Sequence, residues 1–316
     1  MFLCSTNIRL HPPIQRTFRL IKVSKMKNLI LLNIRLMSKR KSFLFIMTLM
    51  LLLAVGIPIF YLKKYWGEYR YSLPSAESLF LINVDSEWWG YISMLIPFMW
   101  IMPYGFTFLY ECKSGVSVYL KTRDTTKTYF YSQMITCFLG SAMVFLIPTL
   151  LNIILTAGIF EVNGNDYVMG YQRYDSNWCN RIMGTNFYKN TLFHGAMFKS
   201  LYINHPVVSS ALKCIWSSLE MGVLGVFAYS VSLIIKKGSI WLMLFVYLFN
   251  QLFRVLNNVW LEYEFFGIYI NWKISDYMAG GHPGYGLCYP CQILLLVALI
   301  MVSLKIVKKK IQGDQI

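Results

Sequence analysis

The chain has 316 residues, of which 56% are apolar and only 14% are charged. Soluble globular domains carry roughly a quarter of their residues as charges, so this composition excludes an ordinary soluble protein and favours a membrane protein. The formal net charge of +16 does not indicate nucleic-acid binding, because the Lys and Arg residues flank apolar segments instead of gathering on a soluble module, and we expect lipid head groups beside them.

The N-terminal region is strongly basic. The first 42 residues contain ten Lys or Arg and no Asp or Glu, which predicts a cytoplasmic N-terminus. We expect residues 1–25 to be disordered, or to be an upstream extension that precedes the natural start at Met26. In residues 26–42, apolar and basic side chains alternate at helical spacing. This pattern fits an amphipathic helix on the inner membrane surface and, equally, a cytoplasmic extension of the first span.

Six later segments are long and apolar enough to cross a bilayer, which takes roughly 20 helical residues. The sequence therefore predicts an all-α polytopic membrane protein whose transmembrane domain covers residues 43–310, followed by a cytoplasmic tail at 311–316. Proline residues at 97, 103 and 148 predict kinks in the second and third spans. The predicted spans are 43–62, 89–110, 130–158, 207–235, 239–258 and 288–307.

Alternation of six spans places both termini inside, together with a basic loop at 111–131. The inside segments are rich in Lys and Arg, as expected for cytoplasmic loops, whereas the outside segments hold slightly more acidic than basic residues. The predicted outer loops are 63–88, 161–206 and 259–287. The last of these is aromatic at first and Gly-rich later, which fits either a short re-entrant helix or an ordinary loop with aromatic anchors.

Some polar and small residues interrupt the spans. Glu220 and Arg254 lie at the same predicted depth in consecutive spans, which predicts an intramembrane charge pair. Such a pair could line a translocation path or latch an outer gate, or it could only fix helix register. Lys213 lies close enough to the outer surface for its ammonium group to reach water. Gly222 and Gly225 predict a face on which another helix can approach closely.

No catalytic or metal-binding pattern is present in the sequence. Cys288 and Cys291 form one C-x-x-C on the predicted outer side, where a disulfide is possible, but no second pair or His spacing indicates a metal site. The phosphate-binding pattern G-x-x-x-x-G-K-[ST] is also absent, so we expect no ATPase activity of this type in the chain itself. We predict no catalytic residues.

The basic loop ECKSGVSVYLKTRDTTKTYFY, residues 111–131, resembles the loop between the second and third spans of ABC-2 type exporter permeases. The stretch FKSLYINHPVVSSALKCIWSSLEMGVLGVFAYSVS is similar to family members from Gram-positive bacteria. The features shared with the family in the loop are Glu111, Gly115, Thr122 with Arg123, and Tyr129 or Tyr131.

The resemblance implies a type V exporter-like permease subunit in the cell membrane that lacks its own nucleotide-binding domain. It would pair with a second permease copy or a sister permease and with a separate ABC ATPase subunit, which would bind ATP and Mg²⁺. It would move an unidentified substrate outward, such as an amphipathic compound, a peptide or a lipid-linked molecule. The residues expected to couple the chain to the ATPase are Glu111, Gly115, Thr122, Arg123, Lys127 and Tyr131.

Other functions are compatible with the sequence. A membrane sensor or assembly scaffold would bind an extracellular partner through the large loop at 161–206. An intramembrane enzyme would need a catalytic residue set, and the sequence contains no close acidic pair or nucleophile motif within its spans.

Overall fold

A computed structural model describes residues 26–67, 76–82, 88–114, 126–162, 205–235, 238–262 and 288–313. Every regular element among these residues is a helix, and they contain no strand. The elements are a helix at residues 26–38, α2 (Lys41–Lys64), α3 (Ala76–Leu79), α4 (Trp89–Ile101), α5 (Thr107–Ser114), α7 (Thr126–Ile159), α11 (Pro206–Ile234), α12 (Ser239–Glu262) and α13 (Cys288–Gly313).

Three of these helices are long and apolar enough to cross a membrane, among the residues described: α2, α7 and α11. The chain is therefore a helical membrane protein. The helices α2, α7 and α11 match three of the predicted spans, because an uninterrupted apolar run of about 20 residues is most stable in lipid as a helix. α12 and α13 overlap the fifth and sixth predicted spans, and their crossing of the membrane stays a prediction.

The second predicted span, 89–110, is two helices instead of one. α4 ends at Ile101, a turn follows, and α5 begins at Thr107. Pro103 in the turn has no N–H to donate along a helix. A Cβ on Gly105 would lie 2.8 Å from the carbonyl oxygen of Ile101, so only glycine fits this tight turn. The prediction of a continuous second span was wrong, and α5 is a separate short helix.

The helix at residues 26–38 is also separate from the next one. It ends before Arg40, whose extended backbone starts α2, so it is not a continuous extension of the first span. Its buried residues recur every four positions, at Leu29, Asn33 and Met37, and they face the bundle. Its location on the membrane surface stays a prediction.

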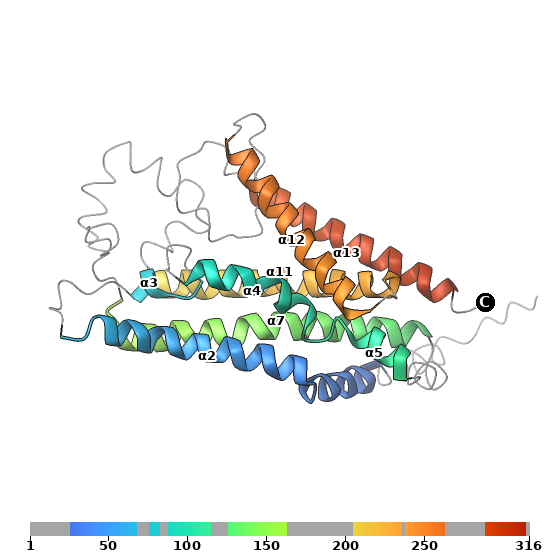
Figure 1. Cartoon of the computed structure of the whole chain (residues 1–316), viewed down its shortest axis with the longest axis horizontal. Coiled ribbons are helices and arrows are strands. Elements are labelled where there is room, and N and C mark those ends of the chain that lie inside the picture. The colour runs from blue at the N-terminus through green and yellow to red at the C-terminus, as the bar shows by residue number, and fades with distance from the viewer. Residues whose placement is uncertain are drawn as a thin grey trace, which may run out of the picture.

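α7 and α11 are the centre of the bundle and pack against each other along their length (Figure 1). α2 packs on α7, whereas α4 and α13 pack on α11. Within the apolar window of α11, 83% of the residues are buried inside the protein, against 28% for α2. α11 is therefore a central helix, and most of α2 is left to face lipid.

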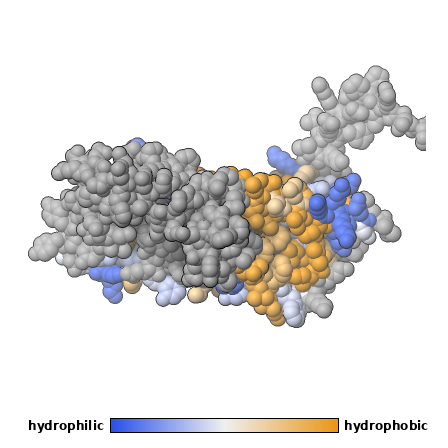
Figure 2. Space-filling view, turned by 90° about the horizontal axis from the view of Figure 1, so that it is seen from above, coloured by the Kyte–Doolittle hydropathy of each residue, from blue (hydrophilic) through white to orange (hydrophobic). Residues whose placement is uncertain are grey.

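Exposed apolar side chains cover much of the described surface. Figure 2 shows one such continuous apolar area, bordered at one end by hydrophilic residues. On α12 the exposed residues include Trp241, Leu244 and Leu248, and on α13 they include Leu294 and Met301. In water such a surface would be unfavourable, whereas hydrocarbon accommodates it without cost.

Glycine allows α7 and α11 to approach closely, as the sequence predicted. A Cβ on Gly222 would lie 2.6 Å from the ring of Phe138, and one on Gly225 would overlap Ser141 of α7. Ser141 also donates a hydrogen bond of 2.9 Å from Oγ to the Trp100 carbonyl, which holds α4 beside this contact.

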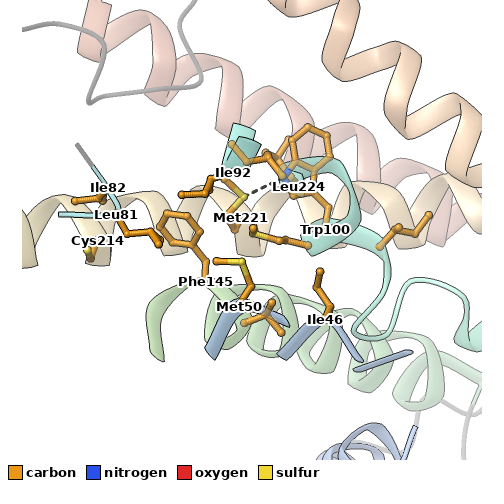
Figure 3. Close-up of a cluster of buried hydrophobic side chains, with 14 of the residues drawn as sticks. Ile46, Met50, Leu81, Ile82, Ile92, Trp100, Phe145, Cys214, Met221 and Leu224 are labelled. Carbon is orange, nitrogen blue, oxygen red and sulfur yellow. Dashed lines mark hydrogen bonds between the residues drawn. The ribbon is translucent and has the colours of Figure 1, made fainter. Parts of the chain in front are cut away.

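The main core lies between the helices around Trp100. In Figure 3 the side chains of Met50, Phe145 and Met221 enter the same core from three different helices, and Met221 reaches the Trp100 indole. Trp100 Nε1 donates to the sulfur of Met221 at 3.0 Å, which satisfies the only polar atom of the ring.

An amide in α7 replaces a hydrogen bond that a proline removes from α2. Pro58 lacks an N–H, so the Ala54 carbonyl cannot accept the usual bond from four residues ahead. Asn152 Nδ2 donates to this carbonyl at 3.1 Å, and Asn152 Oδ1 accepts from the Leu81 N–H at 2.8 Å. One side chain thus joins α2 and the turn after α3 to α7.

We predict that Asn152→Leu destabilises the protein, because it leaves two buried backbone groups without partners, at about 1–3 kcal/mol for each group. In a Pro58→Ala background the loss should be smaller, since the restored N–H of residue 58 can donate to the Ala54 carbonyl. Thermal unfolding in nanodiscs measures both losses. Ile154→Leu, at an exposed site of the same helix, is the control. An equal loss in both backgrounds would contradict this account.

Candidate functional site

The candidate site is a buried carboxylate on α5. Glu111 is only 5% exposed. This burial is unexpected, because the residue lies between the end of the predicted second span and a segment rich in Lys and Arg at 113–127. α5 is short, and its position is fixed at its start, where the Thr107 hydroxyl donates to the Tyr104 carbonyl at 2.6 Å. Phe108, one turn before Glu111, is buried and turns the same side of α5 towards the bundle.

Glu111 accepts hydrogen bonds from two residues of α7. Tyr129 donates its hydroxyl proton to Glu111 Oε2, and Gln133 Nε2 donates to the same oxygen at 2.6 Å. Tyr129 and Gln133 are four residues apart, so one face of α7 presents both donors to α5. The Glu111 carboxylate therefore joins α5 to α7, the two helices that flank residues 115–125.

The bonds continue to α11. Tyr229 donates its hydroxyl proton to Gln133 Oε1 at 2.6 Å. The Gln133 amide thus uses both of its ends, as a donor to α5 and as an acceptor from α11. We call Glu111, Tyr129, Gln133 and Tyr229 the inner network. The inner network therefore connects α5 through α7 to α11, whose apolar window is the most buried of the three long apolar helices described.

The electrostatics of Glu111 follow from its surroundings. Burial raises the pKa of its carboxyl group above the ordinary value of 4.5, because it disfavours the charged form. The hydrogen bonds from Tyr129 and Gln133, and the charge of Arg40, act in the opposite direction and are smaller.

Arg40 fastens the start of α2 to α5. Its Nη1 donates to Thr107 Oγ1 at 2.8 Å, and its guanidinium lies 4.8 Å from the ring centroid of Tyr104 and 5.9 Å from that of Tyr110. The turn between α4 and α5 is therefore held by the residue that begins α2.

The helix at residues 26–38 is attached to the same end of α7. Asn33 Nδ2 donates to Ser132 Oγ at 3.1 Å. Met37 packs against Gly140, where a Cβ would lie 2.5 Å from the methionine sulfur. A Cβ at residue 140 would therefore force the Met37 side chain to shift.

An apolar shell keeps water from the inner network. Side chains from the helix at residues 26–38, α5, α7, α11 and α13, together with Tyr104, contribute to it, and we call this set the inner cluster. Its members are Met37, Tyr104, Phe108, Tyr129, Phe130, Met134, Cys137, Val226, Tyr229, Leu233, Val307 and Ile311.

The predicted coupling residues that the structure describes differ in their exposure to solvent. Glu111 is buried, Lys127 is exposed in the first turn of α7, and Tyr131 is half-buried against the inner cluster. Gly115, Thr122 and Arg123 lie outside the described residues. Both ends of the predicted loop at 111–131 are helical, because α5 extends to Ser114 and α7 begins at Thr126.

Sequence reasoning missed Gln133, Tyr229, Arg40 and Thr107 as parts of this site. Their only sequence signal is that Gln133 and Tyr229 are polar groups within apolar runs, which must find partners in lipid. Tyr129 was considered together with Tyr131, and it is Tyr129 that bonds to Glu111.

The other predicted site residues lie elsewhere. Glu220 is 1% exposed, and its Oε1 accepts a bond of 2.8 Å from Trp216 Nε1 one turn earlier. Arg254 is in α12, but its side chain is outside the described part, so the charge pair stays a prediction. Lys213 is 6% exposed, hence buried within the protein, and the expectation that its ammonium group reaches the outer water was wrong.

The cysteines give no metal site among the described residues. Cys112 is exposed, whereas Cys137 and Cys214 are buried thiols. Within the described part, no group of three His, Cys, Asp or Glu could hold a metal ion. Cys288 and Cys291 are in the first turn of α13 with side chains outside the described part, so their disulfide stays a prediction.

No protein-family model, curated protein or solved structure matches this chain. Function is therefore inferred from the residues and their geometry.

The raised pKa of Glu111 predicts a specific dependence of stability on pH. The folded state binds the proton more tightly than the unfolded state, so the contribution of this group is present below about pH 4.5 and is lost as pH rises through the folded-state pKa. Thermal unfolding of the wild type in nanodiscs should show this loss, and Glu111→Gln should remove it. Glu161→Gln, at an exposed position, is the control. Parallel pH curves for wild type and Glu111→Gln would contradict the assignment.

Proposed function

We propose that the chain is the transmembrane permease subunit of an ABC-2 type exporter. A separate ATPase subunit would bind ATP and Mg²⁺ and hydrolyse the nucleotide, and the chain would convert this work into outward movement of an amphipathic compound, a peptide or a lipid-linked molecule. The chain would itself be no enzyme, and it would act in the cell membrane beside a second permease copy or a sister permease.

The observation that supports this function best is the position of the inner network. Glu111 joins α5 to α7, the two helices on either side of residues 115–125. A soluble partner that grips this segment would therefore move α5 and α7 as one unit. Tyr229 extends the connection into α11, so the displacement would reach the centre of the bundle.

The separation of α4 and α5 supports a coupling role for α5. A short helix that is separated from α4 by the turn at Pro103 and Gly105 could rotate without moving the whole second span. Its hydrogen bonds instead lead to α7 and to the start of α2. We propose six spans overall, with the second one broken at this turn.

The alternative, a sensor or scaffold that binds an extracellular partner through residues 161–206, depends on residues outside those that the structure describes. It predicts that function survives the loss of residues 115–125 but not the loss of the outer loop. An exporter permease predicts the reverse.

Charge reversal at the basic segment tests the proposed partner. We expect Arg123→Glu with Lys127→Glu to abolish co-purification of an ATP-binding subunit from membranes of the native host, because an attractive surface becomes repulsive. The captured subunit is identified by photolabelling with 8-azido-ATP. Lys63→Glu with Lys64→Glu, at the far end of α2, changes the charge equally and should have no effect. If the wild type recruits no ATP-labelled subunit, the proposed function fails.

A second prediction follows from the inner network. It concerns the transmission of movement from α5 to α11, and not the binding of the ATPase subunit. Tyr229→Phe removes the hydroxyl that donates to Gln133 and changes little else. ATPase recruitment should stay at the wild-type level, whereas ATP-dependent change at the outer end of the bundle should be reduced. A cysteine in place of exposed Tyr91 reports this change through its rate of labelling by an impermeant maleimide.

Tyr247→Phe, on the exposed surface of α12, is the matched control for the lost hydroxyl. An ATP-dependent labelling change that is as large in Tyr229→Phe as in the control would show that the inner network carries no motion.

A further inference from the structure

α13 continues beyond the end of its membrane segment. Its exposed face is apolar at Met301, Val302 and Leu304, and then becomes polar at Lys305, Lys308, Lys309 and Gln312. This change places the boundary between lipid and water near Lys305. Eight further residues lead to Gly313, so the helix projects about 12 Å past the boundary. We call residues 305–313 the α13 extension.

The other face of the α13 extension is packed against the coupling region. Val307 is fully buried and Ile311 is 3% exposed, and both belong to the inner cluster together with Phe108 of α5. Lys310 Nζ lies 5.9 Å from the centroid of the Phe108 ring. The extension is therefore attached to the same short helix that carries Glu111.

The end of the bundle to which the α13 extension belongs is strongly basic. Lys308 and Lys309 are exposed there, as is Lys127 of α7. Among the described residues at this end the one acidic side chain is Glu111, which is buried. The exposed surface around α5 is therefore complementary to an acidic surface.

The pattern of the exposed residues favours a protein partner over lipid. On the helix at residues 26–38, exposed basic residues alternate with exposed leucines such as Leu32 and Leu36, and this mixture suits the membrane interface. The exposed face of the α13 extension carries Lys308, Lys309 and Gln312 with no apolar side chain that could insert into lipid. Its lysines face water, where a soluble protein can reach them.

We propose that the α13 extension is a second arm of the partner-binding surface, which takes an acidic face of the soluble subunit that grips residues 115–125. This inference rests on the proposed function. Docking at Lys308 and Lys309 would press on α5 through Val307, Ile311 and Phe108, so both arms would act on the same short helix.

Site-specific crosslinking tests the second arm. A photo-crosslinking amino acid replaces Lys309 in one full-length variant, Lys121 in a second and Lys63 in a third, each expressed in the native host. After irradiation, the membranes are labelled with 8-azido-ATP. We expect positions 309 and 121 to crosslink to the same ATP-labelled polypeptide, and position 63, at the other end of the bundle, to crosslink to none.

The outcomes separate this inference from the proposed function. A crosslink to the ATP-labelled polypeptide from position 121 but not from position 309 would overturn the second arm and leave the exporter function standing. A crosslink from position 309 to lipid alone would likewise overturn it. If neither position reaches an ATP-labelled polypeptide, the proposed function fails and this inference fails with it.

Charge reversal measures how much Lys308 and Lys309 contribute to recruitment of the ATP-labelled subunit. Lys308→Glu with Lys309→Glu should lower recruitment of the ATP-labelled subunit about tenfold at low salt, since attraction becomes repulsion at an exposed surface. The difference from wild type should shrink as ionic strength rises. The paired change at Lys63 and Lys64 is the control. Recruitment that equals that of the control at low salt would contradict the proposal, and an unchanged unfolding temperature would show that the variant is folded.

Discussion

The burial of the Glu111 carboxylate is the interaction on which the inner end of the molecule depends. A carboxyl group in an apolar surrounding is costly unless donors surround it, so Tyr129 and Gln133 must stay in place for α5 to remain docked. Neither donor is free to turn, because Gln133 is held by Tyr229 and Tyr129 is buried in the inner cluster. A single acidic group thereby fixes the mutual position of three helices, which apolar contacts alone would leave able to slide.

Glycine and proline determine where the bundle is rigid and where it can bend. Gly222 and Gly225 bring α11 so close to α7 that the two helices interlock at Phe138 and Ser141. Pro103 and Gly105 have the opposite effect and separate α5 from α4. The inner network, the inner cluster and the packing of Leu109 in the main core join α5 to the rigid pair, and the proposed function would use α5 as a lever on this support.

The sequence predicted the long helices well because lipid leaves a chain few alternatives. An apolar run of about 20 residues in hydrocarbon must satisfy its own backbone, and the resulting helices α2, α7 and α11 match their predicted spans closely. The break in the second span was not predicted, because Pro103 alone indicates a kink and the contact between Gly105 and the Ile101 carbonyl exists only in three dimensions. The partners of Gln133 and Tyr229 could not be read from the sequence either, since they depend on how α7 and α11 are rotated about their axes. Lys213 shows the same limit, because its place in the fourth span was predicted but its burial within the protein was not.

α7 carries a side-chain amide near each of its ends, and each amide forms hydrogen bonds with two other segments of the chain. Gln133 joins α5 and α11 at one end of α7, whereas Asn152 joins α2 and the turn after α3 near the opposite end. The two residues are 19 positions apart, which in a helix corresponds to about 28 Å, close to the thickness of the hydrocarbon core. Because a helix changes little in length under load, a displacement of α7 at Gln133 must appear at Asn152, unless the helix bends at Pro148 between them. Under the proposed function, a displacement of α7 by the partner at one surface would therefore be delivered at the other.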